Sequence, residues 1–336
     1  MKKKLALLLC LVLLVTALAL PASADNSAAW DGSVDTSWYS AEAKTFEIST
    51  PAQLAGLAAI VSGEATGIST DSFKGKTVKL TADLDLGGVK AADGTWSGPC
   101  WKPIGKNYGN AFNGTFLGGG HKISNLYFEK SLSKLTQNIG LFANIGTNGY
   151  VEGINLVSGY LHDENANTNP AGIAGINAGT IVSCHNGADV YGESYIAGIA
   201  ANVSGVIVKC SNSGTIGFAG TASRGSYYGG IAAMAKNIIA NCYNTGTISV
   251  AALEGKAIYA GGIVGIIQKN YTVRTNDILF NCYSSGNIVR SASATSSGPI
   301  YGAYKSLTPR NNYFLKTDAI NSGYSDGVGS AAMDAA

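Results

Sequence analysis

Residues 172–186 read GIAGINAGTIVSCHN, and the recurrence of this pattern along the chain predicts the fold. A Gly-Ile pair followed by a Cys is found four times: Gly172 and Cys184, Gly198 and Cys210, Gly230 and Cys242, Gly262 and Cys282. The Gly-to-Cys distance is 12 residues in three copies and 20 in the fourth, and the distance from Cys to the next Gly is 14 and then 20. Constant segments joined by turns of variable length are typical of a solenoid.

Each repeat is expected to form one coil of stacked parallel strands, about 4.8 Å from the next coil. The sequence therefore predicts an all-β protein, a single-stranded right-handed parallel β-helix with an N-terminal capping helix. The handedness follows the rule for parallel crossovers. Equal positions should form vertical structural ladders, in which asparagine amides satisfy buried polar groups. The predicted ladder residues are Cys184, Cys210, Cys242, Cys282, Asn186, Asn212 and Asn244.

Alternation along a strand predicts which side chains share a face. Counting back by twos from Cys184 places Val182 and Thr180 on the inward face with the cysteine. Ile181 and its equivalents have the opposite parity yet are wholly apolar, and only a bend before the cysteine would turn them inward. Glycines in the following turns are expected to supply positive φ angles: Gly214, Gly246 and Gly286.

The N-terminus has the pattern of a secretory signal peptide. Three lysines precede an apolar run, and the stretch ends in Ala22-Ser23-Ala24, which predicts a leader over residues 1–24. The mature chain is expected to be exported, either secreted or at the cell surface, with no membrane span. Removing the leader lysines takes the formal charge from +2 to −1, and only 13% of residues are charged. This low charge argues against nucleic acid as a partner.

The rest of the chain divides into three predicted regions. Residues 25–125 should form an N-terminal cap and the first coils, residues 126–318 the repeat β-helix, and residues 319–336 a C-terminal tail. One helix is predicted in the cap, beginning at Ser49 or Thr50, with Pro51 in its first turn and Gly63 at its end. It would cover the open end of the stack. Because the chain ends within repeat-like sequence, we expect a truncated segment of a longer protein.

These motifs resemble the GLUG-motif family of bacterial secreted and cell-surface proteins, named for a Gly-Leu-apolar-Gly signature. The matching stretches are residues 140–143 (GLFA), 172–175 (GIAG) and 262–265 (GIVG), with lead-in motifs at residues 80–86 (LTADLDL) and 112–116 (FNGTF). The chain departs from the family at Leu117, where an Asp is usual. The resemblance implies a right-handed β-helix on a secreted or cell-wall protein, sometimes beside immunoglobulin-cleaving metallopeptidases. The repeat itself carries no catalytic residue in the family, so none is transferred.

No catalytic, cofactor or metal site is predicted. A zinc peptidase would need His-Glu-x-x-His, and the three histidines, at 121, 162 and 185, lie far apart. A polysaccharide lyase or hydrolase would need clustered carboxylates, but the acidic residues are scattered, and Asp189 with Glu193 around Tyr191 is the best local cluster. The cysteine column is interpreted as buried apolar filler rather than disulfides or a zinc site. Five cysteines remain in the mature chain, an odd number that excludes a closed disulfide framework.

Tyrosine is abundant, with 17 residues. Rigid amphipathic rings on a sheet suit glycan or protein contact, and they suit ordinary cross-strand pairing equally well. The candidate contact residues, with the turns at 221–228, 251–259 and 269–275, are Tyr191, Tyr227, Tyr228, Tyr243, Tyr259, Tyr271 and Tyr283.

The sequence thus predicts a non-enzymatic, secreted or cell-surface β-helix module of a bacterium. It would act as an adhesin or spacer, with host or cell-wall glycans or proteins as partners. One alternative is a polysaccharide-degrading enzyme. Another is a structural segment of a larger wall protein or an accessory region of a surface peptidase.

Overall fold

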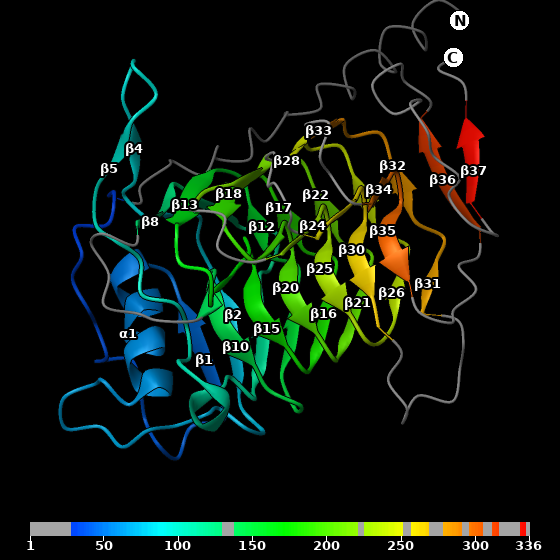
Figure 1. The fold of residues 1–336 in the computed structure, drawn as a ribbon. Helices are drawn as coiled ribbons and strands as arrows, with labels where there is room; N and C mark the ends of the chain where they lie inside the picture. Colours follow the sequence, from blue (N-terminus) through cyan, green and yellow to red (C-terminus); the bar gives the residue numbers. More distant parts are fainter. Residues whose placement is uncertain are drawn as a thin grey trace, which may run out of the picture.

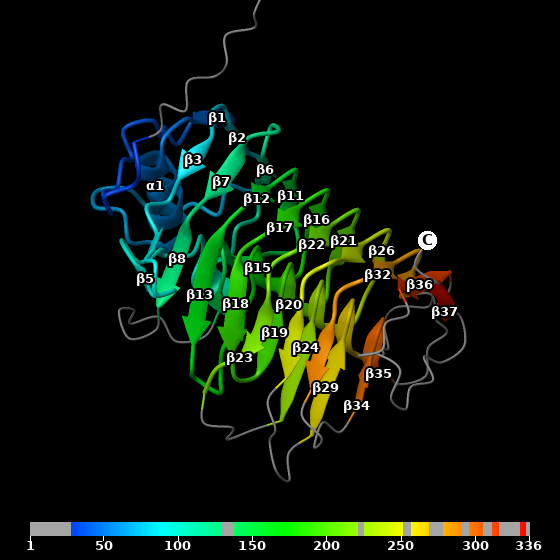
Figure 2. The same ribbon diagram turned by 90° about the horizontal axis from the view of Figure 1, so that it is seen from above.

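The computed structural model describes residues 28–129, 138–220, 225–250, 257–268, 278–290, 296–304, 311–315 and 330–333. Over these residues the protein is a right-handed parallel β-helix, whose coils lie side by side along one axis (Figures 1 and 2). The predicted fold class is therefore confirmed. The predicted leader, residues 1–24, lies outside the described residues.

Two long sheets contain the strands on either side of each cysteine. The first sheet consists of β1 (Thr45–Ile48), β2 (Thr77–Leu80), β6 (Thr115–Leu117), β11 (Tyr150–Glu152), β16 (Thr180–Val182), β21 (Val206–Val208), β26 (Ile239–Ala240) and β31 (Leu279–Phe280). The second sheet consists of β3 (Leu84–Asp85), β7 (Lys122–Ser124), β12 (Asn155–Leu156), β17 (His185–Asn186), β22 (Ser211–Asn212), β27 (Tyr243–Asn244), β32 (Tyr283–Ser284), β36 (Asn312–Leu315) and β37 (Ser330–Met333).

Three further parallel sheets complete the coils. The third sheet consists of β8 (Leu126–Glu129), β13 (Gly159–Asp163), β18 (Asp189–Gly192), β23 (Ile216–Phe218), β28 (Ile248–Val250) and β33 (Ile288–Arg290). The fourth sheet consists of β10 (Phe142–Ile145), β15 (Ala174–Asn177), β20 (Ala200–Val203), β25 (Ala232–Ala235), β30 (Val264–Ile267) and β35 (Tyr301–Tyr304). The fifth sheet consists of β19 (Tyr195–Ala197), β24 (Ser226–Gly229), β29 (Ile258–Gly261) and β34 (Ser296–Gly298).

Two small elements lie outside these sheets. Strands β9 (Asn138–Ile139) and β14 (Asn169–Pro170) pair in parallel. Strands β4 (Val89–Lys90) and β5 (Trp96–Ser97) form an antiparallel hairpin that projects from the N-terminal end of the stack (Figure 1).

The repeats stack in the predicted register. Ile181 pairs with Ile207, which pairs with Ile239 in the next coil. The backbone N of Cys184 lies 3.4 Å from Cys210 Sγ, and the same distance separates the Cys210 N from Cys242 Sγ. Vertical alignment of the cysteines is therefore confirmed.

The predicted strand face before each cysteine was wrong. Ile181 is fully buried, whereas Thr180 and Val182 are only half-buried. The cause is one left-handed residue between the strand and each cysteine, with φ of 52° at Ser183 and 53° to 57° at its three equivalents. Such a residue breaks the alternation of the strand, so Ile181 and Cys184 both point inward.

The glycines after the asparagine ladder are required by close packing and not by positive φ, which corrects the prediction for these turns. The residues with positive φ do not include Gly214, Gly246 or Gly286. A Cβ at Gly214 would lie 2.0 Å from the carbonyl oxygen of Ala188. At Gly246 it would lie 2.1 Å from the carbonyl oxygen of Gly214. The backbones of neighbouring coils leave no room for a side chain here.

The first glycine of each Gly-Ile pair packs against the asparagine ladder. A Cβ at Gly172 would lie 2.0 Å from Asn186 Oδ1, and a Cβ at Gly198 would lie 2.3 Å from Asn212 Oδ1. Each glycine and the asparagine 14 residues later are therefore one packing unit. This unit accounts for the constant spacing of the two motifs in the first three repeats.

Helix α1 (Pro51–Ser62) covers the N-terminal end of the stack (Figure 1). Thr50 and Gln53 form a capping box, and Gly63 ends the helix with φ of 70°, as predicted. Most residues of the helix are apolar and buried, since the coils cover one side of it and the segment before β1 covers another. Its Gly56 touches the preceding segment, where a Cβ would lie 1.9 Å from the carbonyl oxygen of Asp35.

Candidate contact surface

The asparagine ladder is an internal chain of amide hydrogen bonds. Asn186 Nδ2 donates to Asn212 Oδ1 at 2.7 Å, and Asn212 Nδ2 donates to Asn244 Oδ1 at 2.8 Å. The other hydrogen of each amide goes to a backbone carbonyl two residues ahead, at 2.9 to 3.0 Å. All three residues are fully buried, so the ladder stabilises the coils and offers nothing to a partner.

The cysteine ladder is equally internal. Cys184, Cys210, Cys242 and Cys282 are free thiols with at most 1% exposure. Each donates to the carbonyl two residues before it, at 3.2 to 3.4 Å. Burial raises the pKa of the Cys210 thiol. These thiols act as small core residues with a weak donor.

Three tyrosines of the fifth sheet form a continuous ring stack. Tyr195 pairs in register with Tyr227, and Tyr227 with Tyr259. Their ring centroids are 4.8 Å and 5.4 Å apart, with interplanar angles of 11° and 12°. Burial raises the pKa of Tyr227, the middle ring. Because a central ring is covered on both faces, the stack presents edges and hydroxyl groups outward.

Buried alanines support this stack. Ala171, Ala197, Ala201 and Ala233 form a small cluster separate from the main core, and Tyr195 and Tyr227 pack against it. The short side chains let the fifth sheet lie close to the fourth. We call Tyr195, Tyr227, Tyr259 and these alanines the tyrosine face.

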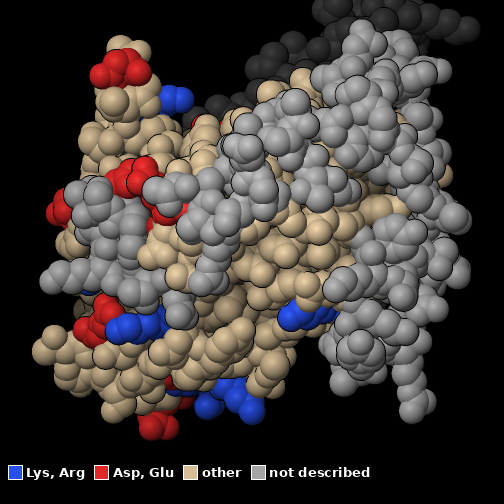
Figure 3. Space-filling view, in the orientation of Figure 1, with Lys and Arg blue, Asp and Glu red and all other residues tan. Residues whose placement is uncertain are grey.

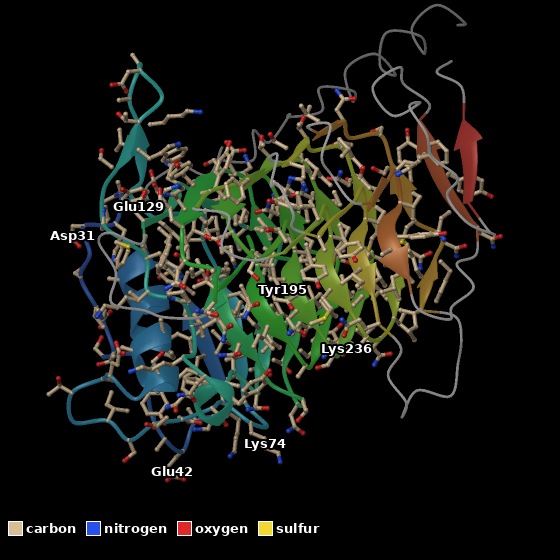
Figure 4. All side chains as sticks on the ribbon, in the orientation of Figure 1. Asp31, Glu42, Lys74, Glu129, Tyr195 and Lys236 are labelled. Carbon is tan, nitrogen blue, oxygen red and sulfur yellow. The ribbon has the colours of Figure 1, made fainter. Side chains whose placement is uncertain are left out.

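Among the described residues, few charged side chains lie around the tyrosine face. Figure 3 shows few Lys, Arg, Asp or Glu atoms over β15, β20 and β25, in the view where Figure 4 places Tyr195 near the centre. Lys236 lies toward the lower edge of that region (Figure 4). The charged residues gather instead near the N-terminal end (Figure 3). The described part of this region therefore offers a partner mainly uncharged groups.

A second tyrosine row runs along the second sheet. Tyr243 pairs with Tyr283, and Tyr283 with Tyr313. Tyr243 is 47% exposed and Tyr313 43% exposed. We call these three residues the outer strip. Tyr313 was missed by the sequence analysis because the spacing of its repeat had decayed.

The other candidate tyrosines differ in their surroundings. Tyr228 is fully buried, so its prediction as a contact residue was wrong; it alternates with Tyr227 on β24 and therefore faces the core. Tyr191 is half-buried, and a Cβ on Gly217 of the next coil would lie 2.4 Å from its ring. Tyr271 and most of the turns at 221–228, 251–259 and 269–275 lie outside the described residues.

One aromatic cluster was not predicted. Trp96 of the projecting hairpin stacks on Tyr160 at 5.9 Å and 10°, and Tyr160 stacks on His162 at 5.7 Å and 18°. His162 Nδ1 lies 3.0 Å from both carboxylate oxygens of Glu129. Burial, helped by Glu129, raises the pKa of Tyr160 to about 12. Sequence could not reveal this cluster because a loop and two coils bring it together.

Acidic residues do not converge in the described part of the chain. No group of three or more His, Cys, Asp or Glu side chains is placed there to hold a metal ion. Asp189 Oδ1 accepts a hydrogen bond from the Thr215 N at 2.8 Å, which is a turn contact. Glu193 is buried, with 1% exposure. Asp189 and Glu193 thus have different environments, and the local cluster seen in sequence is not a shared site.

A hollow of about 660 Å³ lies beside α1. Its lining includes Trp30, Ala58, Cys100 and Lys102. Burial raises the pKa of the Cys100 thiol. Cys100 Sγ lies 3.7 Å from the carbonyl oxygen of Glu129. The thiol is therefore held protonated near neutral pH and is a poor nucleophile.

Comparisons with known proteins support the fold. No family model matches the chain. A crystal structure from Bacteroides ovatus, of a protein provisionally named an immunoglobulin A1 protease, matches with a TM-score of 0.50 and 17% identity, over 86% of this chain and 82% of that one. At this identity the likeness shows a shared β-helix architecture.

A curated relative shares a shorter stretch. A protein of Evansella cellulosilytica, provisionally named a Gly-rich membrane protein, is 35% identical over 104 residues. The match covers 31% of this chain and 10% of the length of that relative. Among the described residues, no helix is both long and apolar enough to cross a membrane.

Proposed function

We propose that this chain is the β-helix module of an exported bacterial surface protein and that it binds a glycan through the tyrosine face. The ring stack of Tyr195, Tyr227 and Tyr259 carries this proposal. The module belongs, on this proposal, with the GLUG-motif surface proteins. Its chemistry is binding and display, without catalysis.

The geometry of the stack supports a polymeric ligand. Stacked rings repeat along the helix axis at 4.8 to 5.4 Å, so their hydroxyl groups form a regular row of donors and acceptors. Tyrosines held in this way lose little conformational entropy on binding. A row of hydroxyls beside an uncharged surface matches a chain of sugar units, which offers alternating hydroxyl and C–H surfaces.

Surface display is supported by three separate observations. The leader-like sequence of residues 1–24 has the pattern of an export signal. The Evansella relative is provisionally named a Gly-rich membrane protein, and the Bacteroides neighbour is provisionally named an immunoglobulin A1 protease. A stiff solenoid suits both a spacer and a binding surface.

A glycan array with matched variants tests the proposal. Replacing Tyr195, Tyr227 and Tyr259 together by Ala should weaken binding at least about tenfold, the usual size for loss of central aromatic contacts. Replacing the outer strip residues Tyr243 and Tyr283 by Ala is the matched control and should leave affinity unchanged. Equal affinity of the tyrosine-face variant and the wild-type protein, at matched thermal stability, would contradict the proposal.

The enzyme alternative is tested with the same preparation. Pectin, alginate and glycosaminoglycans are incubated with the protein, and new reducing ends or unsaturated products are measured. We expect none. If the repurified protein still forms such products, it is a lyase or hydrolase, and the proposal of binding without catalysis is wrong.

A further inference from the structure

A second hollow lies at the lower edge of the fourth sheet, and its lining contains no residue of the tyrosine face. It has a volume of about 380 Å³, within the usual range of small-ligand sites. The short helix η1 (Tyr108–Asn110) contributes one wall and the turn after β10 another. Figure 4 labels Lys74 beside this region. The polar lining residues are Lys74, Tyr108, Asn113, Asn144, Thr147 and Asn148.

The lining is rich in hydrogen-bond donors and contains no carboxylate. Lys74 is exposed and carries a positive charge, and Tyr108 is 76% exposed. The remaining surface is aliphatic, from residues such as Ile145 and Ile176. A ligand that fits needs a negative group, several acceptors and an apolar face. A divalent cation is excluded as the occupant because these side chains offer it no anionic ligand.

Asn144 gives an independent indication of a ligand. The residue is 1% exposed, and its Oδ1 accepts a hydrogen bond from Asn138 Nδ2 at 3.2 Å. Asn138 Oδ1 in turn accepts from Asn169 Nδ2 at 2.7 Å, which fixes the orientation of the row of amides. Asn144 Nδ2 is then a buried donor with no hydrogen-bond partner among the described residues. Such a group is costly unless a ligand supplies an acceptor.

We propose that this hollow binds a carboxylated monosaccharide unit of a glycan. This site extends the glycan binding proposed above and rests on it. Lys74 Nζ pairs with the sugar carboxylate, a charge-assisted contact. Asn144 Nδ2 donates to a ring hydroxyl or carboxylate oxygen, and the Tyr108 ring covers the C–H face of the sugar. The neighbouring Ile176 side chain completes the apolar wall.

The hollow is continuous in register with the surface beside the tyrosine face. Ile176 pairs with Asn202, and Asn202 pairs with Met234 along the fourth sheet. Ala201 and Ala233, which precede these two residues, touch Tyr195 and Tyr227. A glycan chain lying along the helix axis can therefore reach from an acidic unit in the hollow to the stacked tyrosines.

Titration calorimetry of the folded chain with glucuronic acid and with glucose tests this site, because the two sugars differ by the carboxylate. Glucuronic acid should bind at least about tenfold more tightly, the factor expected for one charge-assisted hydrogen bond. Lys74→Met and Tyr108→Ala, both at exposed positions, should each weaken glucuronic acid binding by a similar factor. Lys236→Met, a lysine outside the hollow, is the matched control and should have no effect.

An NMR titration locates the contact on Asn144, whose side-chain amide resonance should shift with glucuronic acid in the wild-type protein. Equal binding of the two sugars, or unchanged glucuronic acid binding in both exposed-site variants, would overturn this site. Loss of array binding in the tyrosine-face variant would in that case leave the proposed function standing. Conversely, the protein could bind glucuronic acid while the tyrosine-face variant still binds the glycan array as the wild-type protein does. That result would contradict glycan binding through the tyrosine face and would support the site in the hollow.

Discussion

Replacing Asn212 by Ala should be among the most destabilising single changes in the repeats. Its amide makes three hydrogen bonds in the interior: one from Asn186, one to Asn244 and one to the carbonyl oxygen of Gly214. All three partners would lose a contact in a site with no exposure. Taking about 1–2 kcal/mol for each buried group left unpaired gives about 3–6 kcal/mol of lost stability.

Urea unfolding followed by circular dichroism measures the total effect, and hydrogen exchange shows where it acts. Because solenoid coils contact only their neighbours, the loss should first appear as faster exchange in the coils around β17, β22 and β27. Asn287→Ala is the matched control, since Asn287 is exposed and should cost less than about 0.5 kcal/mol. If both variants unfold at the same urea concentration, the ladder contributes no stability and the reasoning is refuted.

Two substitutions and one labelling experiment test other parts of the structure. Gly198→Ala should destabilise the protein even in an Asn212→Ala background, because the added Cβ would also lie 2.3 Å from the carbonyl oxygen of Gly230; full rescue in thermal melts would contradict this. Lys76→Met should cost about 1.5–3 kcal/mol, the usual size for a hydrogen bond to a charged group, because Asp71 loses its 2.5 Å ion-pair partner but keeps the hydrogen bonds from Tyr39 and the Phe73 N. Urea unfolding measures the loss. The hydrogen bond from Lys76, with others, lowers the pKa of Asp71 in the folded state, so this stabilisation is present above the unfolded pKa of about 4 and is lost as pH falls through the folded value. Between pH 7 and pH 3 the melting temperature should therefore fall further in the wild-type protein than in the Lys76→Met variant. An equal fall in both proteins would contradict that assignment. Thiol labelling with a maleimide in the folded protein should reach Cys100 before the four ladder cysteines, and equal rates at all five would show that the ladder is accessible.

The repeat pattern was sufficient for the architecture, and it failed where local backbone geometry decides. The stacking of cysteines and asparagines follows from spacing alone, because parallel coils in register place equal positions above one another. The inward direction of Ile181 does not follow from alternation, because it depends on a left-handed φ at Ser183. The asparagines at the equivalent positions 241 and 281 favour that conformation and were the available signal. Gly214 was assigned a turn role with positive φ, whereas the close carbonyl of Ala188 in the neighbouring coil explains it.

The candidate sites were also predicted from the sequence only in part. All three tyrosines of the stack were visible in the sequence, but Tyr195 was not among the contact candidates although it begins the column. Their ring geometry required the packing of the fifth sheet on buried alanines. The hollow with Asn144 was not predictable, since its walls come from four separate parts of the chain between Lys74 and Ala178, and one decisive feature is a missing hydrogen-bond partner.

The repeat pattern and the helix signals along the chain were enough to predict a stack of parallel coils with a helix over one end. A periodic pattern specifies periodic contacts, and the apolar, cysteine and asparagine positions repeat with the coil. Which aromatic rings face outward and which polar groups stay unpaired depends on how the folded coils and loops pack together. Those properties arise where different coils and loops meet, at distances along the chain that no local pattern records.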